Sequence, residues 1–254
     1  MKIVTFNIRR DNHKDRHNNF DFRKSHIIDK INSEKPDVIA FQEVLPHVLD
    51  FLKENLTDYT VIGRGRGRDF KEEACPIAVR NETMEIAEFS TFWLSPTPDV
   101  PGSRFYDQSI FPRICSFAVI RDKEKDFFFR VFNTHLDHIG ENARYLGMRC
   151  LLERMNELEK SLHLPTVLLG DFNEVPSSKV LELVRSNTVP QLRDATADAE
   201  ITYHDYYYGR KEPSKIDYIF LSREFKSFDT SLWKDEFDGV YLSDHYPVST
   251  ETAY

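Results

Sequence analysis

The sequence predicts a mixed α/β fold with mixed or antiparallel sheets. Helix-like and strand-like segments are interspersed along the 254 residues, and 40% of these residues are hydrophobic, which is ample for a sizeable core. Several strand-like segments follow one another directly, whereas a doubly wound parallel sheet needs a helix between its strands. The chain has only 9 Gly and contains no repeat or low-complexity tract. We therefore expect one compact domain over residues 1–254.

The first half of the chain alternates strands with two amphipathic helices. Ile27, Ile28 and Ile31 recur at helical spacing, and Pro36 ends that helix because proline cannot continue it. The alternation of polar and apolar residues in KIVTFNI is typical of a strand. We expect strands at 2–8, 37–43, 59–62, 76–80 and 84–94, and helices at 21–33 and 46–56.

Two further helices and five strands are expected after a proline-rich loop. Apolar residues recur at helical spacing from Leu151 through Met155 and Leu158 to Leu162, which predicts the longest helix of the chain. The strands are expected at 114–120, 127–136, 166–170 and 215–221, with a last strand that begins near Tyr246, and the helices at 141–163 and 177–186.

The formal net charge of −8 and the pI near 5.6 disfavour a surface that coats a polyanion. They do not exclude an enzyme that acts on phosphates, because acidic residues around a divalent cation make such a site negative. The basic stretch RGRGR at 64–68 is either a phosphate contact or, as the more frequent case, a solvated loop. The acidic charge mildly favours a small phosphorylated substrate over long DNA.

The cysteines and the amino terminus bear on location. Cys75, Cys115 and Cys150 form no CxxC pair and predict buried, reduced thiols, which are typical of a reducing compartment. The start, MKIVTFNIRR, has no apolar signal core, and no window has the ~20 apolar residues that span a bilayer. We expect a cytoplasmic protein without a membrane span, and nothing in the sequence indicates an obligate protein partner.

Polar residues stand within or at the ends of strands that are otherwise apolar. Taken singly they have structural explanations, such as a helix cap at Glu43 or a hydrogen-bonded core histidine at His135. Taken together they are costly, because separate burial carries a large free-energy penalty unless they satisfy one another or a cation. They are Asn7, Glu43, His135, Asp171, Asn173, Asp217, Asp244 and His245.

The chemistry of these residues suits one task. Glu43 is a hard oxygen ligand of the kind that Mg²⁺ or Mn²⁺ prefers. His245 beside Asp217 forms an oriented imidazole. Asp171 can orient or deprotonate a water, and Asn173 can donate to a developing oxyanion. The set predicts metal-assisted attack of water on a phosphate ester.

The blocks around these residues resemble the exonuclease–endonuclease–phosphatase superfamily. They are TFNIR, FQEV, NTHLD, GDFN, KIDYIF and SDHYPV, which occur in the family's order and span residues 3–248. The resemblance implies a four-layer α-β-β-α sandwich, in which two mixed, mainly antiparallel sheets are flanked by helices and the site lies at one end. Further stretches, such as WLSPTPDVPGS and TYHDY, look like a bacterial subgroup whose substrates are mostly unassigned.

The resemblance also implies roles at the metal and at the attacking water. Glu43 and Asn7 are expected to hold Mg²⁺ or Mn²⁺, or the waters bound to it, with Asp244 near the metal. Asp171 is expected to position the attacking water, and Asn173 to position the phosphate.

Further roles follow from the same resemblance. His245, oriented by Asp217, is expected to stabilise the transition state. His135 matches a second histidine of the deoxyribonuclease and deadenylase branches and is expected to contact the leaving group or the phosphate. Glu73 stands seven residues before an arginine, as a Glu that supports this histidine does in deoxyribonucleases. Arg113 resembles a phosphate-contacting arginine of the same branch.

Other classes of function have weaker support. A catalytically silent binding module on the same fold is expected to lack Glu43, Asp171 or His245, and all three are present. NTHLDH nearly matches the HxHxDH zinc motif of metallo-β-lactamase-fold hydrolases, but Asn133 stands where the first histidine is required. Nothing in the sequence supports a structural metal beside a protein-binding groove.

The motifs serve phosphodiesters and phosphomonoesters alike, so nucleic acid and a small phosphorylated molecule both remain candidate substrates. The aromatic run Tyr203–Tyr208 either stacks on a base or sugar or packs as a strand. His138 and Arg144 either touch phosphate or are surface groups. Specificity is expected in the loops between the blocks, at 63–74, 95–113, 138–145 and 202–214.

Overall fold

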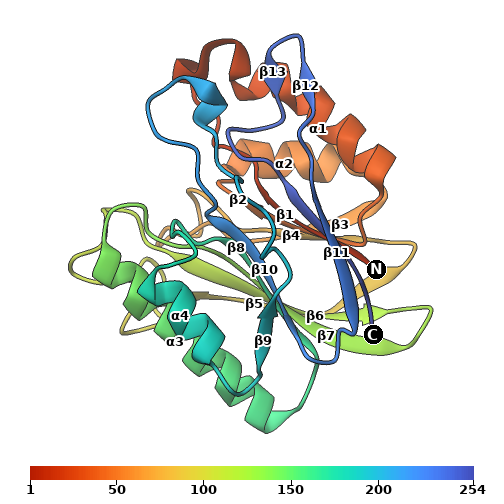
Figure 1. Ribbon diagram of the computed structural model, residues 1–254, viewed down its shortest axis with the longest axis vertical. Coiled ribbons are helices and arrows are strands. Elements are labelled where there is room, and N and C mark those ends of the chain that lie inside the picture. The colour runs from red at the N-terminus through yellow and green to blue at the C-terminus, as the bar shows by residue number, and fades with distance from the viewer.

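The protein is built from two sheets that pack face to face between outer helices, as the computed structural model in Figure 1 shows. The structure describes residues 1–254 apart from the side chain of Ser227. The first sheet has the order β11 (Ser227–Leu232), β14 (Val248–Ala253), β1 (Lys2–Asn7), β2 (Val38–Gln42), β4 (Ile77–Arg80) and β3 (Tyr59–Ile62). The second has the order β5 (Met84–Trp93), β6 (Ile114–Asp122), β7 (Phe127–His135), β8 (Thr166–Asp171), β10 (Asp217–Ser222) and β9 (Leu192–Asp194).

Two helices cover each sheet. α1 (Phe20–Glu34) and α2 (Pro46–Asn55) lie on the first sheet, where Val4 and Ile39 of the strands pack with Ile27 and Leu52 of the helices. α3 (Glu141–Ser161) and α4 (Lys179–Ser186) lie on the second, where buried residues of the sheet pack with buried residues of both helices. Among the described residues, no helix combines the length and the apolar character that a membrane crossing requires.

The core between the sheets follows from the alternation of side chains along the strands. Ile3 and Val38 of the first sheet pack with Val131, Leu169 and Ile219 of the second. Their neighbours in sequence point outward to the helices, because successive side chains of a strand face opposite sides. The two parallel pairs are β1–β2 and β7–β8, and the other pairs are antiparallel. The predicted four-layer sandwich of two mixed, mainly antiparallel sheets is confirmed.

Strand register brings separate blocks of the sequence together. In the second sheet His135 pairs with Asp171, and Asp171 pairs with Asp217 on its other side. In the first sheet Asn7 pairs with Gln42, so Glu43 follows directly beyond the end of β2. The polar residues of the predicted site therefore end neighbouring strands, at one end of the sandwich.

The structure corrects several boundaries. The longest helix ends at residue 161, and the helix expected at 177–186 begins at residue 179. The short strands β9, β11, β12 (Glu236–Phe237) and β13 (Val240–Tyr241) were not expected, because β9, β12 and β13 have no more than three residues and β11 reads SFDTSL, which is largely polar. The 3₁₀ turns η1 (His13–Asn18) and η2 (Asp205–Tyr207) were also not expected.

Three local expectations are also corrected. The strand alternative for Tyr203–Tyr208 is wrong, because three successive residues there have positive φ angles of 50°, 52° and 55°. The solvated-loop reading of RGRGR is wrong for Arg66, which is only 5% exposed. Cys75 and Cys115 are buried as expected, but Cys150 is only partly buried, and all three cysteines are free.

Candidate active site

The candidate site is a cavity of about 200 Å³ at the strand ends described above. Of the residues predicted from the sequence, Glu43, Glu73, Arg113, His135, Asp171, Asn173, Asp244 and His245 line it. Asn7 and Asp217 do not line the cavity; they are 1% and 2% exposed and hydrogen-bond to residues that do. The residues to which the sequence assigned a catalytic, metal or phosphate role thus line the cavity or hydrogen-bond to residues that do.

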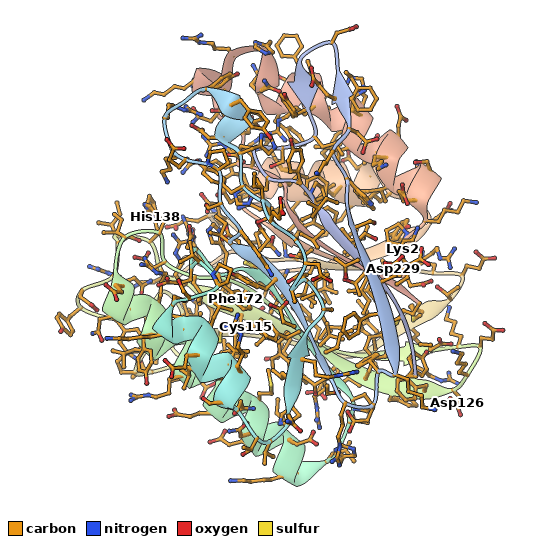
Figure 2. All side chains as sticks on the ribbon, in the orientation of Figure 1. Lys2, Cys115, Asp126, His138, Phe172 and Asp229 are labelled. Atoms are coloured by element: carbon orange, nitrogen blue, oxygen red, sulfur yellow. The ribbon has the colours of Figure 1, made fainter. Side chains whose placement is uncertain are left out.

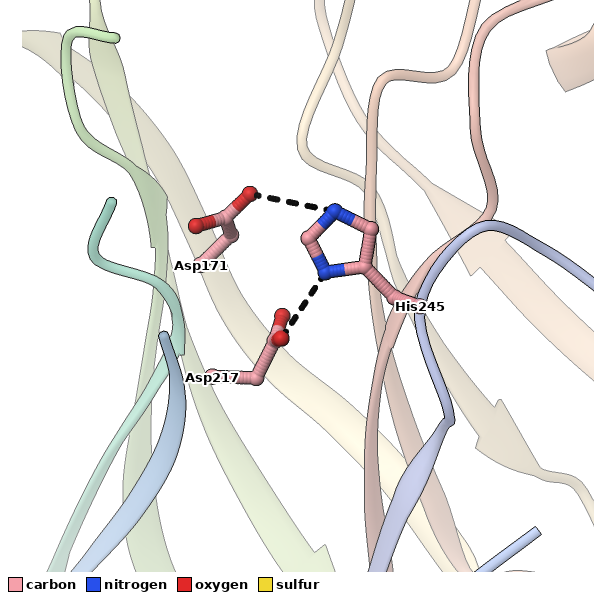
Figure 3. A group of neighbouring side chains, drawn as sticks. All are labelled: Asp171, Asp217 and His245. Carbon is pink, nitrogen blue, oxygen red and sulfur yellow. Dashed lines mark hydrogen bonds and ion pairs between the residues drawn. The ribbon is translucent and has the colours of Figure 1, made fainter. Parts of the chain in front are cut away.

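His245 stands between two carboxylates (Figure 3). Its Nδ1 is 2.8 Å from Oδ2 of Asp217, and its Nε2 is 3.8 Å from Oδ2 of Asp171. Although burial lowers it, the Asp217 carboxylate raises the pKa of His245 to about 10. The imidazole is therefore a cation at neutral pH, and its Nε2–H side faces Asp171.

Asp171 is the most connected carboxylate of the site. Its Oδ2 accepts the Asn7 side-chain N–H at 2.9 Å and lies 3.4 Å from Nε2 of His135, while its Oδ1 accepts the backbone N–H of Asn173 at 2.8 Å. Burial, followed by the charge of Asp217, raises the pKa of Asp171 to about 7. A carboxylate held this way is suited to take a proton from water near neutral pH.

Local backbone geometry places two of the site residues. Gly170 has a φ of +139°, and a Cβ added there would lie 1.9 Å from the carbonyl oxygen of Thr134. Glycine thus lets β8 approach β7 closely just before Asp171. Glu43 and Asn173 have positive φ angles of 62° and 50°, which ordinary residues rarely adopt and which concentrate at functional sites. The strain turns each side chain out of its strand direction.

Glu43 and Asp244 form the acidic end of the cavity. Glu43 accepts the backbone N–H of Arg10 at 2.8 Å and the side-chain N–H of Asn7 at 3.3 Å. The Arg9 guanidinium lies 3.4 Å from Asp244. Burial raises the pKa of Glu43, but the charge of Arg9 together with His135 and the backbone N–H of Arg10 outweighs it and holds that pKa below its usual range. Burial raises the pKa of Asp244 despite Arg9.

The cavity also has cationic lining residues. Arg113 and Arg66 are 4% and 5% exposed, and both line the cavity. Among the described residues, Nη1 of Arg113 has no hydrogen-bond partner. A guanidinium that lines a cavity is suited to contact a phosphate oxygen.

Glu73 stands among arginines. Its carboxylate is 2.8 Å from Nη1 of Arg66 and 3.3 Å from Nη1 of Arg10. Both Glu73 and His135 line the cavity, but the ion pairs of Glu73 are to these arginines. Burial, then the nearby Glu43, raises the pKa of Glu73. The geometry gives Glu73 a part in placing Arg66 and Arg10, and its predicted support of His135 stays a prediction.

Comparison with known families decides what kind of site this is. The sequence model described as the endonuclease/exonuclease/phosphatase family matches residues 4–245. The chain belongs to the endonuclease/exonuclease/phosphatase family. This family hydrolyses phosphoric esters, and the buried Asp171, Asp217 and His245 stand in the matched region.

Similar members of the endonuclease/exonuclease/phosphatase family have known structures. A Bacteroides vulgatus member is 32% identical, with a TM-score of 0.87 over 99% of this chain and 98% of that one. A protein of unknown function from Enterococcus faecalis is 30% identical, with a TM-score of 0.88 over 100% of this chain and 99% of that one. A mannosyl-6-phosphatase from Bacteroides thetaiotaomicron is 29% identical, with a TM-score of 0.86 over 100% of both chains.

The oxygen donors of this family member fit a hard divalent cation. Glu43, Asp171 and Asp244 bring three carboxylates into one small cavity, where burial raises the pKa values of Asp171 and Asp244, so a bound cation would favour their charged forms. Asn7 is different, because its N–H₂ faces Glu43 and Asp171 and its Oδ1 accepts the backbone N–H of Arg9 at 3.0 Å. In this arrangement the N–H₂ group of Asn7 bridges two carboxylates, and its side-chain oxygen is engaged by the backbone rather than turned to a cation.

Several cavity residues escaped the sequence reasoning. Arg9 and Arg10 directly follow the TFN block, and their place in the cavity has no sequence signal beyond that adjacency. Tyr203 lines the cavity with its ring 4.9 Å from that of His245. His204 instead packs among tyrosines, 4.2 Å from the ring of Tyr246. Phe111, Lys211 and Ile216 also escaped the sequence reasoning, whereas Tyr203, Arg66 and His138, which the sequence leaves open between two alternatives, line the cavity.

Arg144 is not a surface group, because its side chain is only 13% exposed. Its Nε donates to Glu174 at 2.6 Å and its Nη1 donates to the carbonyl oxygen of Asp137 at 3.1 Å. It does not line the cavity. His138 does line the cavity, so His138 and Arg144, which the sequence left open, lie in different places.

Proposed function

We propose that this chain is a divalent-metal-dependent phosphomonoesterase that acts on a small, sugar-like phosphate. The observation that carries the proposal is the cavity of about 200 Å³, which is lined both by carboxylates, among them Glu43 and Asp244, and by the guanidinium of Arg113. A cavity of this size takes a phosphate and part of one sugar ring, whereas a nucleic-acid strand needs a long cationic groove. The net charge of −8 agrees with that choice.

The sugar-like substrate has one further support. A mannosyl-6-phosphatase shares 29% identity and a TM-score of 0.86 with this chain over the full length of both. We take from that protein the class of substrate, a phosphorylated sugar, as the first one to test.

The metal belongs in this proposal at the acidic end of the cavity. Glu43 and Asp244 would hold Mg²⁺ or Mn²⁺, which supplies positive charge for the phosphate oxygens. The ligand atoms of Asp171, Asp217 and His245 lie within 4.8 Å of one another, but the 2.8 Å bond to Asp217 already occupies Nδ1 of His245. A cation there would have to break the pair that orients the imidazole.

The residues of the chain then divide the work. Asp171 accepts a proton from the attacking water, because its pKa is raised towards neutrality and it faces the cavity. His245, kept cationic by Asp217, donates to the phosphate oxygens as negative charge develops. The side-chain N–H₂ of Asn173 donates to the carbonyl oxygen of Leu136 at 3.0 Å, which fixes its carboxamide at the cavity edge. Arg113 and His135, which also line the cavity, contact the phosphate.

A metal-dependent substrate panel tests the proposal. Purified protein with Mg²⁺, Mn²⁺ or EDTA is offered mannose 6-phosphate, p-nitrophenyl phosphate, bis-p-nitrophenyl phosphate and single-stranded DNA, with Asp171→Asn as the inactive control. We expect release of phosphate from the two monoesters, lost with EDTA and in the variant. Cleavage of the diester and DNA but not of the monoesters would replace the proposal with a phosphodiesterase or nuclease. No cleavage and no Mg²⁺ or Mn²⁺ binding would favour a silent binding module.

A further inference from the structure

His138 is one of the cavity residues that have no assigned role. It follows Asp137 in the loop between β7 and α3, and Figure 2 labels it near the start of α3. It lines the cavity, and its side chain is 41% exposed, so it stands at the rim rather than at the floor. The ring of Phe111, which also lines the cavity, is 6.3 Å away.

The contacts of His138 fix its tautomer. Its Nδ1 lies 2.8 Å from Nη2 of Arg113. An arginine can only donate, so Nδ1 must be the acceptor and carry no proton. The ring proton of a neutral imidazole is then on Nε2. Burial, followed by the charge of Arg113, lowers the pKa of His138, which agrees with a neutral ring.

Asp137 holds this pair in place. Its Oδ1 accepts from Nε of Arg113 at 3.3 Å and from the Ser109 hydroxyl. Its Oδ2 accepts backbone N–H groups of Ser109, Ile139 and Gly140 at 3.1, 3.2 and 2.8 Å. Asp137 is 2% exposed, so these bonds are protected from water. The rim around His138 is therefore preorganised before a substrate arrives.

We propose that His138 is a specificity-determining residue, whose Nε2–H donates a hydrogen bond to an oxygen of the leaving group. Among the described residues, no hydrogen-bond partner engages Nε2, whereas Nδ1 is committed to Arg113. Because Arg113 meets the phosphate and His138 stands farther out, the group that His138 reaches is the part of the substrate that departs. A sugar hydroxyl or ring oxygen accepts such a bond. The inference rests on the proposed function, whose substrate it specifies further.

Histidine ring NMR tests the inference without turnover. Two-bond ¹H–¹⁵N spectra at pH 7 with EDTA, assigned with His138→Asn, should show the Nε2–H tautomer for His138. Mannose 6-phosphate should shift its Nε2 signal, and inorganic phosphate should not. A proton on Nδ1, a cationic ring, or an equal shift with both probes would overturn the assignment. An unshifted signal under saturating mannose 6-phosphate would overturn it as well.

Kinetics with paired variants test it in the active enzyme. His138→Asn keeps an acceptor near Arg113 and removes the outer donor, whereas His138→Gln places an amide N–H near the position of Nε2. We expect His138→Asn to lower kcat/KM for mannose 6-phosphate about tenfold through KM, with His138→Gln restoring most of it. Turnover of p-nitrophenyl phosphate, whose leaving group has no hydroxyl, should change less than about twofold. The exposed His13→Asn is the matched control.

The outcomes separate the two proposals. Unchanged kinetics in His138→Asn while the wild type cleaves mannose 6-phosphate would defeat the inference alone. Equal losses with both esters would place His138 on the phosphate and also contradict it. A wild type that cleaves neither ester would defeat the proposed function, and the NMR measurement would then decide the inference, because it requires only binding.

Discussion

At the scale of single residues, the imidazole of His245 lies between the carboxylates of Asp217 and Asp171. Oδ2 of Asp217 lies 2.8 Å from Nδ1 of His245 and keeps the ring cationic, while Oδ2 of Asp171 lies 3.8 Å from Nε2, the other ring nitrogen. Burial pushes the pKa of Asp171 up and the Asp217 charge pushes the pKa of His245 up. In the proposed mechanism Asp171 is the base near neutral pH and His245 the fixed donor, although both groups and Asp217 are buried.

Replacing the orienting carboxylate should therefore cost turnover rather than folding. Asp217→Asn removes the anion that keeps His245 cationic, so we expect kcat on p-nitrophenyl phosphate to fall about 10²- to 10⁴-fold with little change in KM. Steady-state kinetics and circular dichroism measure the two effects. The exposed Asp229→Asn serves as the control. A variant with wild-type kcat would show that Asp217 does not act through His245.

At the scale of elements, the close approach of β7 and β8 helps to bring polar residues from the ends of three strands next to one another. His135, Asp171 and Asp217 stand in one line of register across β7, β8 and β10. Gly170 makes this approach possible, since any Cβ there would lie 1.9 Å from the carbonyl oxygen of Thr134. The sheet itself thus fixes these three residues of the site.

A methyl group at Gly170 should disrupt this element. We expect Gly170→Ala to lower the free energy of unfolding by about 3 kcal/mol or more, because strain at φ +139° adds to the clash. Gly209→Ala, which shares a positive φ of +71° but meets no atom within 4 Å, should cost only about 1–2 kcal/mol. Urea unfolding compares them. Equal losses would mean that the contact with Thr134 carries no weight.

The loop between β7 and α3 has a pH-dependent anchor. Burial raises the pKa of Asp137, but bonds from Gly140 and Ser109 outweigh it and hold that pKa below its usual range. A carboxyl with a depressed folded-state pKa stabilises the protein above its unfolded pKa of about 3.9, and this contribution is lost as pH falls below it.

Asp137→Asn should reveal this dependence. We expect it to lower the free energy of unfolding by about 1–3 kcal/mol at pH 7 and by clearly less at pH 3. Urea titrations of the variant and the wild type at both pH values measure the difference. A loss that is the same at pH 3 and pH 7 would contradict an ionised anchor at Asp137.

At the scale of the whole molecule, strand and helix periodicity predicts the mixed α/β class, whereas the four-layer sandwich and the roles at the site follow from the family resemblance of the sequence blocks. Ile3 faces the other sheet and Val4 the helices, as strand alternation requires. The chemistry-bearing residues close apolar strands, which is visible in the sequence. Arg66 and Lys211 carry no such signal, since their place in the cavity depends on how loops fold back. The short strands β9, β12 and β13 form through tertiary packing that local sequence does not encode.

Metal binding should stabilise the whole fold. Mg²⁺ that binds the folded chain alone adds about 2.7 kcal/mol at a concentration of 100 times its Kd. We expect a higher Tm with millimolar Mg²⁺ in the wild type and none of that rise in Glu43→Gln. Differential scanning calorimetry with Mg²⁺ and with EDTA measures both. A wild-type Tm that is unchanged by Mg²⁺ and Mn²⁺ would contradict the assignment of Glu43 as a metal ligand.

The most direct measurement is phosphate release from mannose 6-phosphate by the wild type and by Asp171→Asn, with Mg²⁺ or EDTA. The account predicts steady phosphate release that needs both the metal and the Asp171 carboxylate. The wild type and Asp171→Asn are expected to have the same fold. Release that persists in Asp171→Asn or in EDTA would contradict it, as would cleavage confined to phosphodiesters.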